Sequence, residues 1–243
     1  MSSGASHING TVLYPGEEFS AYETVSPFTE ANGYAMAGSY LNGEVVDSMG
    51  GGICQVSTTL YNAVLRAELN VTERSPHSMT VHYVDLSEDA AIAGTYKDFK
   101  FVNSTEYPIY IEGYTTSDKK ITFNIYGKET RDKNRTISFE SQMVSETPAT
   151  TILQEDAGQG IGYKAVSSKG SSGYVAELYK IVKVNGVETD RIKVNKSTYK
   201  GTNRVVTYGT AGDPTLSENL RAAIAAQDEA LADANIAAAV PAQ

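Results

Sequence analysis

Three consecutive glycines stand directly before the only cysteine of the chain, in the stretch Gly50-Gly51-Gly52-Ile53-Cys54. Glycines let the backbone turn tightly, and the run from Cys54 to Leu69 that follows them is amphipathic. Its apolar side chains recur at intervals of three and four residues, which places on one helix face Ile53, Val56, Leu60, Ala63, Val64 and Ala67. The pattern therefore predicts a helix that begins at the cysteine.

A cysteine at the start of a helix faces unpaired backbone N–H groups and the positive end of the helix dipole. Both favour the thiolate, which is the nucleophilic form. The alternative is a small buried core residue, the usual place of a free cysteine. Gln55 and Ser57 could help to bind an oxyanion, together with the N–H groups of the Gly50–Cys54 turn, or could be ordinary helix-start residues.

A cysteine nucleophile needs a base, normally a histidine that a third polar group holds. The chain has three histidines, His7, His77 and His82. The first seven residues resemble an artificial boundary rather than a natural terminus, so we set His7 aside and expect any membrane anchor outside this sequence. His82 is expected to be a partly exposed residue of a strand at 79–84. His77, at the start of that strand, is the preferred partner, although an ordinary polar turn residue remains the alternative.

A family resemblance extends from about residue 8 to 128. Three stretches follow one another in the order GGGICQVSTTLYNAVLRAEL, ERSPHSMTVHYVDLSEDAAIA and DFKFVNSTEYPIYIEG. In this order they resemble the core of the VanW domain, a family named after an accessory protein of vancomycin resistance. The resemblance implies a cell-surface protein of a Gram-positive bacterium. Some members are implied to be L,D-transpeptidases, which cross-link peptidoglycan stem peptides through a cysteine.

The resemblance also implies which residues form the site. Cys54 would be the nucleophile, His77 its partner and Asp89 the group that orients His77, although Asp89 could equally cap a turn. Arg74 matches the arginine of the motif and could bind the carboxylate of a stem peptide through two hydrogen bonds, or form a surface ion pair. The remaining expected substrate contacts are Gly51, Gly52, Gln55, Ser57 and Ser78.

The predicted fold class is α+β, with an N-terminal mixed sheet packed on one main helix. Aromatic and β-branched residues predict strands near 79–84, 99–103, 108–113 and 121–126. Tyr14-Pro15-Gly16 predicts a turn, and Asn42-Gly43 and Asn185-Gly186 each predict a hairpin.

The chain is expected to divide into a catalytic domain (1–128), a smaller elongated β domain (129–211) and an Ala-rich tail (212–243). Residues 154–210 resemble a five-glycine extracellular module, which implies a wall-binding or spacer role. In the tail, Leu220, Ile224 and Leu231 are too sparse for a firm apolar stripe, so it reads as a marginal helix or a linker.

Composition excludes several classes. The net charge is −9, which gives no basic face for nucleic acid. The histidines and the cysteine lack the spacing of a zinc site, and no phosphate-binding motif follows the glycines, so we expect neither metal nor cofactor. We expect a monomeric, extracellular cysteine acyltransferase that acts on peptidoglycan stem peptides. The alternatives are a non-catalytic peptidoglycan-binding module and a papain-like wall endopeptidase or amidase.

Overall fold

The computed structural model describes residues 1–41 and 44–239. They form a mixed α/β structure with many strands and short helices. Packing divides the chain into two compact units. Unit 1 comprises Met1–Ser145 and Val175–Tyr199, and unit 2 comprises Glu146–Tyr174 and Lys200–Gln243. The domain boundaries predicted after residues 128 and 211 stay a prediction.

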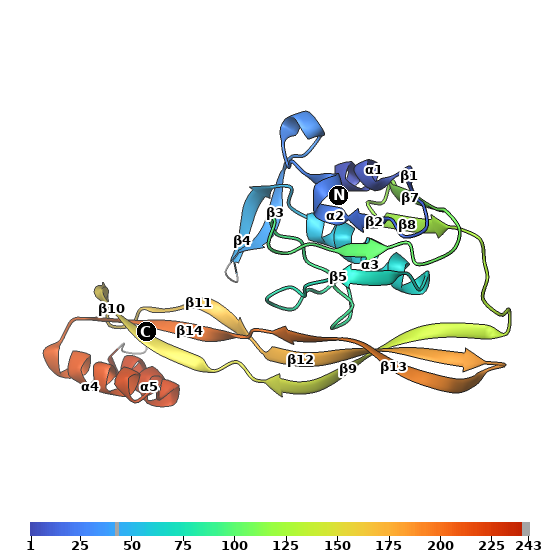
Figure 1. Cartoon of the computed structure of the whole chain (residues 1–243). Coiled ribbons are helices and arrows are strands. Elements are labelled where there is room, and N and C mark those ends of the chain that lie inside the picture. Colours follow the sequence, from blue (N-terminus) through green and yellow to red (C-terminus); the bar gives the residue numbers. More distant parts are fainter. Residues whose placement is uncertain (42–43, 240–243) are drawn as a thin grey trace. The chain divides into compact units, whose positions relative to one another are not determined.

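Unit 1 begins with short helices and strands and ends with two long strands (Figure 1). Its helices are α1 (Ser2–Ile8), α2 (Ala21–Val25), the 3-10 helix η1 (Glu30–Asn32) and α3 (Ile53–Arg66). Its strands are β1 (Thr11–Leu13), β2 (Glu18–Ser20), β3 (Met36–Leu41), β4 (Glu44–Met49), β5 (Asn70–Glu73), β6 (Lys100–Val102), β7 (Ile109–Thr115), β8 (Ile121–Tyr126), β9 (Arg135–Thr147), β12 (Gly173–Val184) and β13 (Val187–Tyr199).

The N-terminal part of unit 1 contains separate small sheets rather than the one mixed sheet that we predicted. Their strand orders are β1-β7-β8, β2-β6-β5 and β3-β4, and every described pairing in them is antiparallel. Three of these strands, β1, β2 and β6, are only three residues long. The predicted strands near 99–103, 108–113 and 121–126 correspond to β6, β7 and β8. The turn at 42–43 lies outside the described residues.

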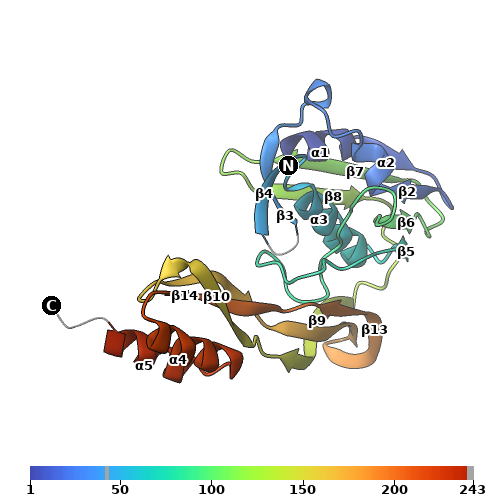
Figure 2. The same ribbon diagram turned by 90° about the vertical axis from the view of Figure 1, so that its left-hand side faces the viewer.

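Helix α3 lies at the centre of the unit 1 core. Its predicted face is confirmed, because Ile53, Val56, Leu60 and Val64 are buried while Ala63 and Ala67 are half-buried against them. Figure 2 shows α3 beside the sheet of β7 and β8. Helix α1 packs into the same core through Ala5 and Ile8, so the segment expected to be an artificial boundary is part of the fold.

The strand predicted at 79–84 is wrong. Residues 74–98 run mostly without regular structure, apart from turns and isolated bridges. Backbone groups on either side of residues 79–84 bond to side chains instead of to a neighbouring strand. The Asp89 carboxylate accepts the backbone N–H of His77, and the Arg74 guanidinium donates to the carbonyl oxygens of Ser87 and Asp89. Polar side chains that satisfy backbone groups compete with sheet formation, which the pattern of aromatic and β-branched residues does not reveal.

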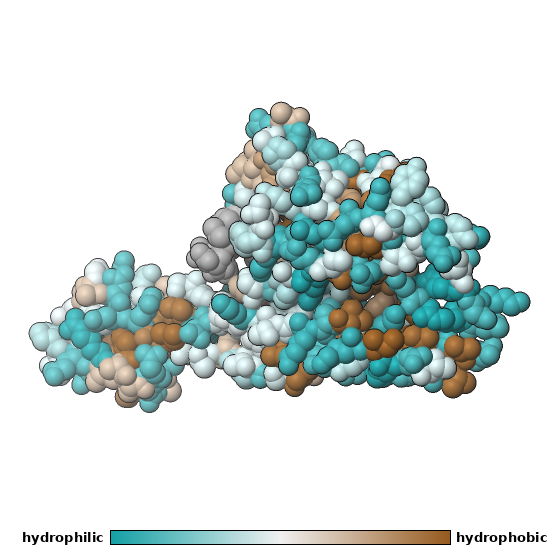
Figure 3. Space-filling model, in the orientation of Figure 1, coloured by the Kyte–Doolittle hydropathy of each residue, from teal (hydrophilic) through white to brown (hydrophobic). Residues whose placement is uncertain are grey.

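The long strands of unit 1 form a sheet in the order β13-β12-β9. Asn185 and Gly186 have φ values of 53° and 81°, which confirms the hairpin turn predicted between β12 and β13. Hydrophobic patches run along these strands on the face seen in Figure 3. Their exposed apolar side chains include Met143, Val144, Val187 and Ile192.

Unit 2 joins three strands and two helices. They are β10 (Thr151–Gly160), β11 (Lys164–Ser171), β14 (Thr202–Ala211), α4 (Pro214–Ala225) and α5 (Glu229–Ala239). The Ala-rich tail is therefore helical, and the linker alternative is wrong for the described part, because Leu220 and Ile224 are buried with Leu153, Val206 and Tyr208. Small alanines at 223 and 232 complete this core where larger side chains are sparse. None of the described helices is long and apolar enough to cross a membrane.

Candidate functional site

The glycine turn before α3 brings two backbone segments into close contact. A Cβ atom on Gly51 would lie 2.2 Å from the carbonyl oxygen of Ala37, so only glycine fits there. Gly52, the residue before the helix, has a φ of 84°, which glycine adopts without strain. The helix consequently starts at Ile53 and places Cys54 in its first turn, as predicted.

Replacing Gly51 with alanine is expected to lower the free energy of unfolding of the protein by about 1–3 kcal/mol, because the added methyl group overpacks this contact. Urea unfolding measures the change. Gly127→Ala is the matched control, since the nearest atom to its Cβ would be a side-chain methyl of Ile109 at 3.2 Å. Equal losses in the two variants would contradict the close approach at Gly51.

Some N–H groups in the first turn of α3 already donate hydrogen bonds to backbone carbonyls of the described residues, whereas the N–H of Cys54 does not. Ile53 and Gln55 already donate to the carbonyl oxygens of Gly50 and Gly52, each at 3.1 Å. Among residues 1–41 and 44–239, no backbone carbonyl accepts from the N–H of Cys54. This N–H lies at the positive end of the helix dipole, so it is a suitable donor for negative charge that develops beside the sulfur.

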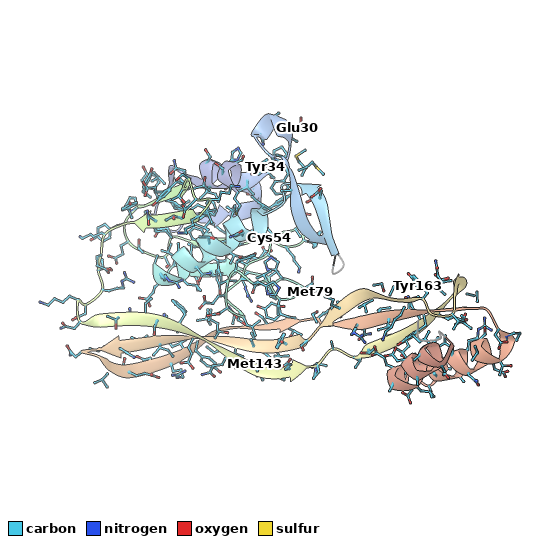
Figure 4. All side chains as sticks on the ribbon, turned by 180° about the vertical axis from the view of Figure 1, so that it is seen from behind. Glu30, Tyr34, Cys54, Met79, Met143 and Tyr163 are labelled. Atoms are coloured by element: carbon cyan, nitrogen blue, oxygen red, sulfur yellow. The ribbon has the colours of Figure 1, made fainter. Side chains whose placement is uncertain are left out.

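Cys54 is half-buried at the amino end of α3, where Figure 4 labels it. Its Sγ atom lies 3.4 Å from the carbonyl oxygen of Ile92. Two hydroxyl groups of α3 form hydrogen bonds with Ala90, which lies two residues before Ile92. Ser57 donates to the Ala90 carbonyl oxygen at 2.6 Å, and Thr58 accepts from the Ala90 N–H at 3.0 Å. Ser57 is only 1% exposed, so its hydroxyl is directed to Ala90 rather than available for the oxyanion role considered above.

His77 lies between Asp89 and Cys54. Its Nδ1 atom is 2.6 Å from Asp89 Oδ2, and its backbone N–H donates to the same oxygen, also at 2.6 Å. Burial lowers the pKa of His77, but hydrogen bonds with Asp89 and Cys54 and the charges of both groups outweigh burial and raise the pKa to about 9. The structure thus brings together the three residues predicted as catalytic, with a protonated imidazole beside the sulfur at neutral pH.

This arrangement makes the stability of the protein depend on pH. The pKa of His77 rises from 6.5 to about 9 on folding, so protonated His77 contributes fully below pH 6.5, and this stabilisation is lost as the pH rises through 9. We expect the difference in free energy of unfolding between the wild type and His77→Gln to be largest at about pH 6, to fall between about pH 6.5 and 9, and to have lost this contribution above about pH 9. Urea unfolding across this range measures it. The exposed His82 gives the control variant His82→Gln. A difference for His77→Gln that stays constant across the range would contradict the pairing.

Arg74 is buried against Asp89, with only 6% of its side chain exposed. Its Nη2 donates to Asp89 Oδ1 at 2.8 Å, its Nε to the Asp89 carbonyl oxygen at 2.6 Å, and its Nη1 to Ser197 Oγ at 2.8 Å. The predicted role of binding a substrate carboxylate does not agree with this geometry, because the guanidinium is buried and already donates in three directions. Arg74 instead holds Asp89 in place.

Asp89 is itself 1% exposed and ionised. Burial raises the pKa of this carboxyl, but hydrogen bonds from His77 and Tyr199 and the charge of Arg74 outweigh burial and hold the pKa below its usual value. The carboxylate is therefore a fixed anion on which the orientation of His77 depends.

Two other predicted contacts, Gln55 and Ser78, are the sequence neighbours of Cys54 and His77. Gln55 is half-buried in the first turn of α3, and Ser78 is exposed in the segment that also carries the labelled Met79 (Figure 4).

Two tyrosines at the site were not predicted from the sequence. Tyr83 places its hydroxyl 3.5 Å from His77 Nε2, and Tyr199 donates to Asp89 Oδ1 at 2.6 Å. Nothing in the spacing pointed to either residue, because one lies in an irregular segment and the other is 110 residues from its partner.

A cavity of about 880 Å³ lies at the opposite end of α3 from Cys54. It is lined in part by Arg66, Arg131 and Arg135. Glu68 accepts hydrogen bonds from Arg131, Arg135 and Lys180. The hydrogen bond from Arg135 is the largest cause that lowers the pKa of Glu68 to about 2, against the effect of burial. Since this network already pairs two of the cavity's arginines, the chemistry favours the Cys54 centre as the functional site.

Comparisons with known proteins identify two family matches in the chain. Residues 1–126 match the family of VanW like proteins, and residues 139–211 match the G5 domain. An uncharacterized Bacillus subtilis (strain 168) protein, YoaR, is 40% identical over 111 residues, which are 46% of this chain and 37% of YoaR. The vancomycin B-type resistance protein VanW of Enterococcus faecalis (strain ATCC 700802 / V583) is 30% identical over 133 residues, 52% of this chain and 47% of that protein.

The chain thus spans less than half the length of these two relatives. Among solved structures, the G5 domain of IgA1 protease is 24% identical, with a TM-score of 0.26, and is matched over 35% of this chain and 100% of that domain. The HP0197-G5 structure is 20% identical, with a TM-score of 0.21, over 31% of this chain and 97% of that chain. On the family match to residues 1–126, the chain belongs to the VanW-like proteins, and a G5 domain follows its VanW-like part.

Proposed function

We propose that this chain is an extracellular, cell-wall enzyme that transfers acyl groups through Cys54, as an L,D-transpeptidase acting on peptidoglycan stem peptides. The observation that carries the proposal is the contact series from Cys54 through His77 to Asp89, beside a helix N-terminus. Membership of the VanW-like family and the presence of a G5 domain support a role at the cell wall.

The first half of the reaction forms a thioester. The Cys54 thiolate attacks the carbonyl carbon that precedes the terminal D-amino acid of a stem peptide, and the carbonyl oxygen becomes an oxyanion near the N–H of Cys54. The C–N bond then breaks, and the imidazolium of His77 gives its proton to the leaving amine. Asp89 keeps the imidazole oriented during this transfer, since its Oδ2 holds both Nδ1 and the backbone N–H of His77.

The second half transfers the acyl group to an amine of another stem peptide. Neutral His77 accepts a proton from the attacking amine, a new C–N bond forms, and the C–S bond breaks to return the thiolate. With water in place of the amine, the same steps give a carboxypeptidase, so water exclusion and acceptor binding decide between the two outcomes.

Incubation of the purified chain with tetrapeptide-bearing muropeptides tests the proposal. Chromatography with mass spectrometry should detect the released terminal D-alanine and a dimer linked between two diamino acids. Binding of wall fragments without turnover would instead favour a non-catalytic binding module. Cleavage within the stem or at the glycan junction would favour an endopeptidase or amidase.

A further inference from the structure

The Asp89 carboxylate is held on both sides by different groups. Oδ2 accepts from His77, whereas Oδ1 accepts from Arg74 at 2.8 Å and from the Tyr199 hydroxyl at 2.6 Å. The Tyr199 oxygen in turn accepts the backbone N–H of Ser87 at 2.7 Å. Tyr199 is 3% exposed and Asp89 is 1% exposed, so solvent does not compete strongly for these bonds.

Tyr199 belongs to the end of β13, and two other side chains of this strand reach the same segment. Ser197 Oγ accepts from Arg74 at 2.8 Å, and Asn195 Nδ2 donates to the Ser87 carbonyl oxygen at 3.0 Å and to the Tyr61 hydroxyl at 2.8 Å. Residues 195, 197 and 199 alternate along β13, so their side chains project from one face of the strand. That face meets the segment that carries Asp89 and the arginine bound to it.

We propose that Tyr199 is a positioning residue for the Cys54 site, and that the end of β13 completes this site from outside the 1–126 match. This inference rests on the proposed function. Two donors on Oδ1 fix the rotation of the Asp89 carboxylate, and this rotation directs Oδ2 at His77 Nδ1. The family match to residues 1–126 contains Cys54, His77 and Asp89 but not Tyr199. The G5 match at 139–211 contains β13.

Tyr199→Phe in the full chain tests the inference, because it removes one hydroxyl and keeps the buried ring. The matched control is Tyr179→Phe on β12, whose hydroxyl donates to Glu177 at 2.6 Å, away from Asp89. NMR of ¹⁵N-histidine-labelled protein reads the Nδ1 proton of His77, with His77→Gln used to assign the signal. We expect Tyr199→Phe to move this resonance and to lower kcat about tenfold at nearly unchanged KM, as loss of one supporting hydrogen bond does at other sites.

The control should match the wild type in both measurements. A His77 signal in Tyr199→Phe that is identical to that of the wild type would overturn the positioning role, whether or not the protein has transpeptidase activity. A displaced signal in a protein without turnover would support the positioning role and count against the proposed function. The two ideas therefore fail separately.

Discussion

Cys54→Ala is expected to abolish transfer to the second stem peptide while the melting temperature changes by less than about 3 °C. The thiol is half-buried, and its polar contacts are the 3.4 Å contact with the Ile92 carbonyl and the hydrogen bond with His77, so alanine removes the nucleophile and little packing. Dimer yield and thermal unfolding measure the two effects.

Ser57→Ala is the matched comparison from the same helix. It deletes a buried hydroxyl that donates to the Ala90 carbonyl at 2.6 Å and leaves that oxygen short of one donor, so it should cost about 1–3 kcal/mol of stability and retain some turnover. If Cys54→Ala unfolds easily and keeps partial activity, Cys54 is a core residue and the acyltransferase proposal fails.

Asp89→Ala is expected to have the largest effect on stability, about 3–5 kcal/mol, and also to abolish turnover. The substitution leaves the guanidinium of Arg74, 6% exposed, without its counter-charge, and it removes the acceptor that both Nδ1 and the backbone N–H of His77 use. Urea unfolding and the dimer assay measure the two losses.

Asp118→Ala is the control, because Asp118 forms an exposed ion pair with Lys120 and should change stability by no more than about 0.5 kcal/mol. Asp89→Asn keeps the shape of the side chain and isolates the contribution of its charge. If Asp89→Ala lowers the free energy of unfolding by less than about 1 kcal/mol, another group neutralises the charge of Arg74, and Asp89 is not the buried anion of the site.

The centre of the site was predictable because local sequence determines it. The glycine turn and the apolar spacing that follows place Cys54 at the start of α3, and both are properties of a short stretch. The family motif supplied His77 and Asp89, and the structure places all three in contact. By contrast, Arg74 was assigned to substrate because spacing alone does not reveal which carboxylate an arginine meets.

The features that could not be predicted from the sequence depend on contacts between distant parts of the chain. Tyr199 reaches Asp89 from 110 residues away, which no periodicity within β13 indicates. The strand expected at 79–84 fails for a related reason, since a strand needs a partner elsewhere in the chain and none of the described sheets includes these residues. In unit 2, alanines that form no apolar pattern in the sequence are buried in one core with Leu220 and Tyr208.

The most direct test of covalent catalysis is intact-protein mass spectrometry after brief incubation with a stem tetrapeptide and no acceptor. The proposed mechanism predicts a mass increase equal to one stem peptide less its terminal residue, located at Cys54 by peptide mapping and absent from Cys54→Ala. Wall peptides that bind without a covalent adduct would contradict it, as would dimer formation by Cys54→Ala.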